Sequence, residues 1–191
     1  MIMNKIKAKI TKKTSLISEV ESKLNDQVKM EGVSSQFYLA AASWCEREGY
    51  ENAANFLYGH SEEERMHMLK LIKYINASGG YALAPEIDGL KYEYESLREV
   101  FEDVLEHEIK VTNSINDLVD FSFKVKDYAT FQFLQWYVAE QREEEELARR
   151  VIEIFDIIGE EGQGLWFIDK EIAKLKDQAD SGELGAIDSA E

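Results

Sequence analysis

The sequence predicts an all-α protein, a four-helix bundle with one long crossover between its second and third helices and a short fifth helix. The chain of 191 residues contains one proline and eleven glycines, too few turn residues for a many-stranded β sandwich. Hydrophobic residues make up 45% of the chain and recur every three or four positions over long stretches, the period of an amphipathic helix. This length predicts one domain, at most two, with a sizeable core.

Four long stretches and one short stretch carry this helical period. The first stops at Gly49, which suits a left-handed C-terminal cap, and the third begins at Ser96, with Glu99 at the capping-box spacing. We expect helices over about residues 16–48, 51–77, 128–158 and 165–176. The third helix along the chain is expected to begin at about residue 96 and to end at a link formed by residues 124–127. The apolar stripe of the first helix is predicted to contain Val20, Leu24, Val28, Tyr38, Leu39 and Ala42.

The lengths of the connections predict the topology. Short links at residues 49–50 and 124–127 make two antiparallel hairpins. Between the hairpins, residues 79–95 hold the only proline, Pro85. About 17 extended residues span up to ~55 Å, whereas a helix of about 28 residues is ~42 Å long. We therefore expect this segment to run the whole length of the bundle, so that the third helix starts at the opposite end.

The chain is strongly acidic, with 22 basic against 38 acidic side chains and a formal net charge of −16. This charge argues against a nucleic-acid partner, because phosphate binding needs a basic face; it suits either solubility or the attraction of cations. The single cysteine, Cys45, excludes an internal disulfide and a CxxC site and favours a reducing compartment, so we expect a cytoplasmic protein. We expect no membrane partner, because no apolar stretch approaches the ~18 residues of a membrane span. We also expect no secretory signal, because no continuous apolar h-region or small-residue cleavage site follows the basic start.

Charge and composition divide the chain into three parts. Residues 1–15 carry several lysines in an otherwise acidic protein, and we expect them to form a solvated basic extension. Residues 16–178 contain the helical domain. Residues 179–191 are rich in small and acidic residues, and we expect a flexible tail.

A carboxylate interrupts each apolar stripe near the middle of its helix. The steps between these polar residues and their apolar neighbours are three or four, so they share the face that packs inward. Unpaired buried carboxylates cost several kcal/mol each and repel one another. Either they take up protons or a multivalent cation neutralises them. The interrupting residues are Glu31, His60, Glu64, His67, Glu108, Glu140 and Glu144.

The residue types in this set suit a transition metal. A single glutamate in an apolar stripe is most often an edge residue that reaches solvent, but four of them, one on each helix, form a pattern. Glu64 and His67 lie one turn apart on one face. Carboxylate with imidazole suits iron, manganese or zinc better than calcium. One glutamate from each of two helices, with Glu-x-x-His on a third, is most of the di-iron pattern of helical bundles.

Three segments, residues 31–38, 60–67 and 131–146, resemble prokaryotic non-haem ferritins, and the resemblance covers about residues 16–175. It implies that residues 16–178 form a ferritin-like di-iron domain that stores iron and has ferroxidase activity. Fe(II) is oxidised with O2 or H2O2 at a di-iron centre, and Fe(III) is stored as a mineral inside a hollow homo-oligomeric cage, by resemblance a shell of 24 subunits.

The resemblance also assigns roles by position. It implies two ferroxidase irons in each subunit and a third, transit iron. Tyr38 and Gln141 are placed beside the di-iron centre, Tyr38 as a catalytic residue and Gln141 among the metal-site residues. The first iron site is assigned Glu31, Glu64 and His67, the second Glu64 (bridging), Glu108 and Glu144, and the transit site Glu63, Glu140, Glu143 and Glu144.

Two departures separate the chain from bacterioferritins. Bacterioferritins repeat Glu-x-x-His on the fourth helix, where this chain has Leu147 three residues after Glu144. They also take an axial haem methionine after the bridging glutamate, where this chain has Arg65. We therefore expect no haem, and we expect the second iron site, which has no imidazole, to bind iron less tightly than the first.

Two other functions stay open from the sequence. One is a rubrerythrin-like peroxidase or another di-iron carboxylate oxidase, although the cysteine-rich module that rubrerythrins commonly carry cannot be built from one cysteine. The other is a metal-free interaction bundle whose inward glutamates are protonated or paired. Of the remaining polar and aromatic residues, His60 is interpreted as a positioning or core histidine, Trp136 as a core residue and His107 as exposed.

Overall fold

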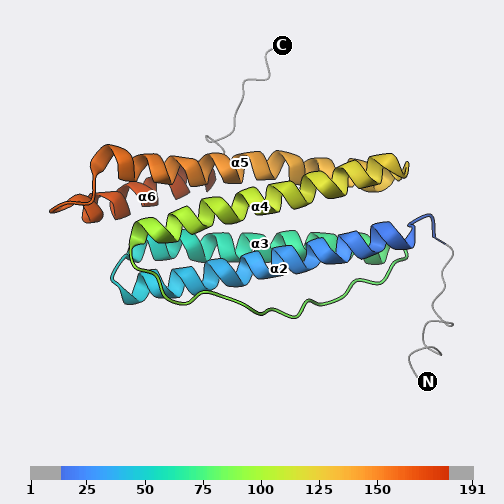
Figure 1. Ribbon diagram of the computed structural model, residues 1–191, viewed down its shortest axis with the longest axis horizontal. Coiled ribbons are helices and arrows are strands. Elements are labelled where there is room, and N and C mark those ends of the chain that lie inside the picture. Colours follow the sequence, from blue (N-terminus) through green and yellow to red (C-terminus); the bar gives the residue numbers. More distant parts are fainter. Residues whose placement is uncertain (1–13, 181–191) are drawn as a thin grey trace, which may run out of the picture.

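The computed structural model describes residues 14–180 and contains five helices and no strands within that range (Figure 1). The predicted bundle is confirmed: four long antiparallel helices lie side by side, and the fifth helix lies against one end. Most of the predicted extension and tail, residues 1–13 and 181–191, lies outside the described residues. The helices are α2 (Ser18–Arg47), α3 (Glu51–Ala77), α4 (Leu97–Lys124), α5 (Tyr128–Ile158) and α6 (Gly164–Asp180).

The ends of the helices follow from local chemistry. Gly49 adopts φ +89 after α2, a left-handed conformation that a glycine takes without steric cost. The Ser96 hydroxyl accepts a hydrogen bond from the Glu99 backbone N–H at 3.1 Å, as the capping-box spacing predicts. Asp127 caps α5 in the same way, accepting from Thr130 N–H at 3.1 Å. The two hairpin links and the start of α4 therefore lie where the sequence predicts them.

The crossover, residues 79–95, runs along the whole bundle and brings α4 to the end opposite its departure from α3 (Figure 1). It lies against α2 at Gly32, where an added β-carbon would be 2.8 Å from Pro85 Cγ and 3.2 Å from Ile87 Cδ1. Only a glycine leaves room for this approach. The Asn25 side chain also accepts a hydrogen bond from Leu83 N–H at 2.8 Å, so α2 holds the crossover along its length.

Two apolar clusters fill the bundle, one on each side of a polar layer. In each long helix the polar residues separate members of one cluster from members of the other. Full burial of a large apolar side chain contributes about 1.5–3 kcal/mol, so the two clusters stabilise the fold while the unpaired charges between them oppose it. One cluster contains Leu57, Phe101 and Phe155, and the other contains Leu24, Leu71 and Ile115. The polar layer consists of Glu31, His60, Glu64, His67, Glu108, Gln141 and Glu144.

Helix α6 packs on α3 and α5 and is attached by a buried carboxylate. Asp169 Oδ1 accepts hydrogen bonds from the backbone N–H groups of Asn52 (3.1 Å) and Ala53 (2.9 Å) at the start of α3. A carboxylate at a helix N-terminus satisfies free N–H groups and complements the helix dipole. The fifth helix is therefore part of the bundle's structure.

Three assignments of individual side chains are wrong. Leu39 is 41% exposed and Trp136 is 38% exposed; each is one residue from a fully buried tyrosine, and one residue turns a helix by about 100° away from the core. His107, expected to be exposed, is partly buried: its ring stacks on Phe37 with centroids 4.7 Å apart, and its Nε2 lies 2.7 Å from Ser34 Oγ.

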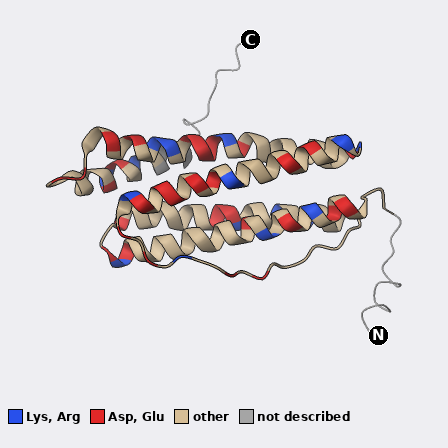
Figure 2. Ribbon diagram, viewed as in Figure 1, with Lys and Arg blue, Asp and Glu red and all other residues tan. Residues whose placement is uncertain are grey.

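The excess of acid follows the helices. Acidic residues occur along the surfaces of all four long helices, with consecutive acidic residues near the middle of α3 and of α5 (Figure 2). The acidic residues at mid-bundle therefore adjoin the buried carboxylates of the polar layer.

Among the described helices, none has a stretch both long and apolar enough to cross a membrane.

Candidate metal centre

The half of the polar layer on α2 and α3 contains Glu31, Glu64 and His67, whose potential ligand atoms lie within 4.8 Å of one another. The two carboxylates are each 1% exposed. Glu31 Oε2, both carboxylate oxygens of Glu64 and His67 Nδ1 have no hydrogen-bond partner among the described residues. Buried polar atoms are almost always paired, so four unpaired atoms in one cluster point to a ligand. We call this group the α2/α3 half-site.

Burial without partners changes the acidity of this half-site. Desolvation, followed by the nearby charge of Glu64, raises the pKa of Glu31 well above its ordinary value. Burial and the Glu108 carboxylate raise the pKa of Glu64 in the same direction. A bound cation would reverse both effects, because it favours the charged carboxylate. Two carboxylates and one imidazole are a donor set that suits iron, so these residues fit the metal that the sequence predicts.

The other half, which we call the α4/α5 half-site, contains Glu108 and Glu144, and its Glu108 carboxylate has hydrogen-bond partners. Glu108 Oε1 accepts a hydrogen bond from Tyr38 Oη at 2.6 Å, and its Oε2 accepts from Gln141 Nε2 at 3.0 Å. Burial and the nearby Glu144 raise the pKa of Glu108 to about 7 despite these two donors. Tyr38 and Gln141 therefore contact this half-site, as the resemblance implies.

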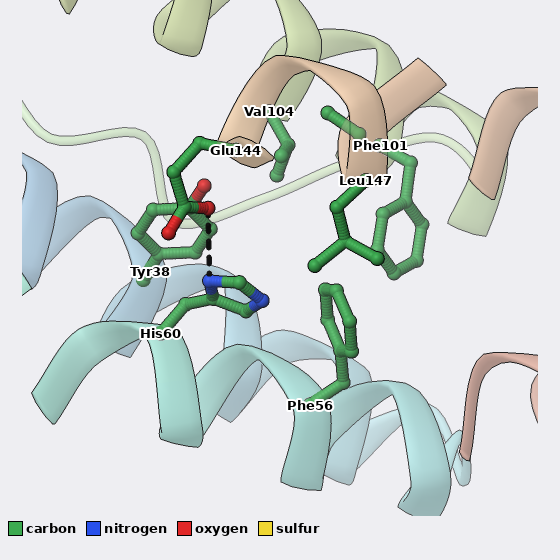
Figure 3. A pocket seen from close by; sticks show the side chains of 8 residues that line it. Tyr38, Phe56, His60, Phe101, Val104, Glu144 and Leu147 are labelled. Atoms are coloured by element: carbon green, nitrogen blue, oxygen red, sulfur yellow. Dashed lines mark ion pairs between the residues drawn. The ribbon is translucent and has the colours of Figure 1, made fainter. Parts of the chain in front are cut away.

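Glu144 lies within ion-pair distance of His60, which reaches it from α3, although His60 Nδ1 has no hydrogen-bond partner among the described residues. His60 Nδ1 lies 3.4 Å from Glu144 Oε2 (Figure 3). Burial raises the pKa of Glu144, but the nearby imidazoles of His60 and His67 together outweigh it and lower that pKa. Because His60 lies one turn before Glu64, its position on the inward stripe was visible in the sequence; its pairing with a residue 84 positions away was not. The absence of an imidazole at Leu147 is thus partly compensated from another helix.

Leu147 itself belongs to an apolar wall. Together with Phe56, Phe101 and Val104 it lines a small hollow next to His60 and Glu144 (Figure 3). This wall adjoins the α4/α5 half-site on the side of the cluster that contains Phe101. A polar ligand has no hydrogen-bonding surface on that wall, so Tyr38, His60 and Glu144 supply the polar contacts of the hollow.

The acidic residues expected at a third site lie nearer the surface. Ligand atoms of Glu63, His67 and Glu140 fall within 4.8 Å of one another, as do those of His60, Glu63 and Glu144. Glu63 is exposed and Glu140 is half-buried; burial raises the pKa of Glu140. Glu143 is exposed and belongs to none of these groups in the described part of the chain.

Comparisons with known proteins agree with this architecture. Residues 21–158 match the Ferritin family, described as the ferritin-like domain. A probable bacterial non-heme ferritin-like protein of Haemophilus influenzae is 44% identical over 164 residues, which cover 86% of this chain and 99% of that protein. The chain belongs to the ferritin family.

Other relatives extend this conclusion. A bacterial non-heme ferritin of Escherichia coli is 40% identical to this ferritin over 160 residues, covering 84% of this chain and 97% of that protein. The structure of an open pore ferritin from Archaeoglobus fulgidus superposes with a TM-score of 0.81 at 36% identity, covering 83% of this chain and 97% of that chain. The prediction of an iron-storage ferritin is confirmed at the level of the family.

Proposed function

We propose that this ferritin binds two Fe(II) ions per subunit in its polar layer and oxidises them with O2 or H2O2. The observation that carries the proposal is the set of four unpaired ligand atoms on Glu31, Glu64 and His67, each in a side chain at least nine-tenths buried. Such an arrangement destabilises the metal-free fold, and a divalent cation removes the penalty. The first Fe(II) therefore binds at the α2/α3 half-site.

Glu64 is the bridging ligand. Neither of its oxygens has a hydrogen-bond partner among the described residues. Its carboxylate lies near Glu31 and His67, and it also feels the charges of Glu108 and Glu144. The second Fe(II) binds between Glu64 and the α4/α5 half-site. Two Fe(II) ions supply two electrons, the number that converts O2 to H2O2, and the protein's contribution is to hold both ions together.

Fe(III) then leaves for a mineral store. Glu63, Glu140, Glu143 and Glu144 offer carboxylates between the buried centre and the surface, where a third, transit ion binds. Like many homo-oligomers, the protein closes into a symmetric shell, for which we propose 24 subunits in the cytoplasm. Chains of 22.0 kDa then give a particle of about half a megadalton, which light scattering or native mass spectrometry measures; a monomer or dimer would contradict the shell.

The ligand assignment is tested by Glu64→Ala, with Glu62→Ala as its matched control. Glu62 is an exposed carboxylate on the same helix, so its replacement makes the same side-chain change without touching the half-sites. We expect Glu64→Ala to slow aerobic Fe(II) oxidation by at least about 100-fold, since even partners outside the ligand shell contribute 10–100-fold. The rate of appearance of the ferric absorbance measures this, and unchanged kinetics would contradict the assignment.

A further inference from the structure

Gln27 is a buried polar residue that the proposed chemistry does not use. It lies one helical turn before Glu31 on α2 and is 1% exposed. Its Nε2 donates to Glu31 Oε1 at 2.8 Å, and its Oε1 accepts from Ser114 Oγ, on α4, at 2.6 Å. The three side chains form a chain of hydrogen bonds from α4 across to the α2/α3 half-site.

The Glu31 carboxylate sets which end of the Gln27 amide faces it, and Ser114 holds the other end. A carboxylate accepts hydrogen bonds and cannot donate one, so a metal-binding Glu31 needs the amide nitrogen toward it. The Ser114 hydroxyl donates to the opposite, carbonyl end of Gln27, which anchors the side chain so that its nitrogen stays beside Glu31. The hydrogen bond from Gln27 to the charged Glu31 carboxylate is charge-assisted, and such bonds are stronger than neutral ones.

The consequence for Glu31 is a difference between its two oxygens. Its Oε1 is held by Gln27, whereas its Oε2 is unpaired and lies among the ligand atoms of the α2/α3 half-site. Glu64, in contrast, has both oxygens free. We propose that Gln27, held by Ser114, is a positioning residue that makes Glu31 a one-oxygen ligand of the first metal ion. This inference rests on the proposed function and deepens it.

The test uses Co(II) as a redox-stable probe in the full-length protein under anaerobic conditions. Gln27→Leu removes both hydrogen bonds at similar side-chain size and frees both oxygens of Glu31. We expect the first Co(II) to bind about tenfold more weakly. We also expect its visible d–d bands to weaken, because an added oxygen ligand raises the coordination number. The spectrum is a readout that a purely structural role would not change.

Ser114 supplies a second, milder pair of variants. Ser114→Ala leaves Gln27 in place but releases its orientation, so we expect a smaller loss of affinity in the same direction. Ser114→Thr keeps the hydroxyl and should restore the original affinity and spectrum. Tyr74→Phe is the matched control, because it removes a hydroxyl that lies 2.9 Å from Thr130 Oγ1, outside the polar layer; both Co(II) readouts should stay unchanged.

The outcomes separate this inference from the proposed function. If the original protein binds Co(II) tightly, Glu64→Ala abolishes that binding, and Gln27→Leu and Ser114→Ala change neither affinity nor spectrum, the positioning role is wrong while the metal centre stands. If the original protein shows no Glu64-dependent Co(II) binding, the proposed centre is wrong and the inference with it. Circular dichroism of each variant confirms that it is folded, and Ser114→Ala decides the question should Gln27→Leu not fold.

Discussion

The two half-sites contain similar residues but differ in how their ligand atoms are paired. In the α2/α3 half-site, Glu64 and His67 leave ligand atoms without hydrogen bonds. In the α4/α5 half-site, Tyr38 and Gln141 donate hydrogen bonds to Glu108. Each half-site also has one looser contact between a carboxylate and an imidazole: His67 Nδ1 lies 3.6 Å from Glu64 Oε1, and His60 Nδ1 lies 3.4 Å from Glu144 Oε2. A metal ion entering the first half-site relieves an existing penalty, whereas an ion entering the second competes with existing contacts. We therefore expect the first site to bind Fe(II) more tightly.

This reason differs from the one that the sequence suggests. The sequence attributes a weaker second site to Leu147, which stands where bacterioferritins have a histidine. His60 supplies an imidazole near Glu144 from α3, so an imidazole is not missing from that half-site. The expected order of affinities stays a prediction, and its physical basis becomes the two hydrogen bonds that Glu108 accepts from Tyr38 and Gln141.

The largest effect should come from comparing Glu31→Ala with Glu108→Ala. Glu31→Ala removes a ligand from the unpaired half-site and should weaken the tight Fe(II) binding event by at least about 100-fold. Glu108→Ala should leave that event in place and remove the weaker one. Anaerobic calorimetric titration with Fe(II) measures both events. Equal weakening of both events by either variant would show that the half-sites do not bind metal separately.

A second test uses pH on the metal-free protein. The pKa values of Glu31, Glu64 and Glu108 are all raised by burial, that of Glu108 to about 7. A carboxyl whose folded pKa lies above its unfolded value binds its proton more tightly when folded. Its stabilising contribution is present below about pH 4.5 and is lost as the pH rises through about 7.

For Glu108 alone this loss is on the order of 3 kcal/mol, so the thermal midpoint in chelator should fall between pH 5 and pH 8. The Glu108→Gln variant has no titrating carboxyl group at this position, so its thermal midpoint should fall less over the same pH range. Saturating Zn(II) should remove most of the dependence, because the cation favours the charged carboxylates. A midpoint that rises with pH in the metal-free protein would contradict the raised pKa values of these buried carboxyl groups.

The smallest effect should come from His60→Gln. It removes the imidazole that pairs with Glu144 but keeps a polar side chain of similar reach. We expect the second Fe(II) to bind about tenfold more weakly and the first to be unaffected. The same titration measures this. If the second Fe(II) bound as tightly as in the original protein, the missing imidazole at Leu147 would again explain a weak second site. If the first Fe(II) bound more weakly, His60 would contribute to both half-sites.

Much of the fold follows from patterns that act within one helix. The breaks at Gly49, Ser96 and Asp127 and the length of the crossover were sufficient to predict the two hairpins and their order. The errors occur at the edges of the stripes: Leu39 and Trp136 lie about 100° from buried neighbours, and His107 is covered by Phe37. Such positions depend on how each helix is rotated against its neighbours, which periodicity within one helix does not specify.

The contacts of the centre show a similar division. Glu31, Glu64, His67, Glu108 and Glu144 could be predicted as inward-facing residues, because a charge inside an apolar stripe is visible in the sequence. The link from Ser114 to Gln27 and the pairing of His60 with Glu144 could not. Each joins two helices far apart along the chain and depends on their relative height to within the length of a hydrogen bond.

The sequence alone therefore determined which residues enter the middle of the bundle, because helical period and local caps act over a few residues. Only the tertiary structure decided which of their oxygen and nitrogen atoms are hydrogen-bonded and which are left for a metal ion. That outcome depends on the rotation and register of four helices, set by the packing of the two apolar clusters on either side of the polar layer.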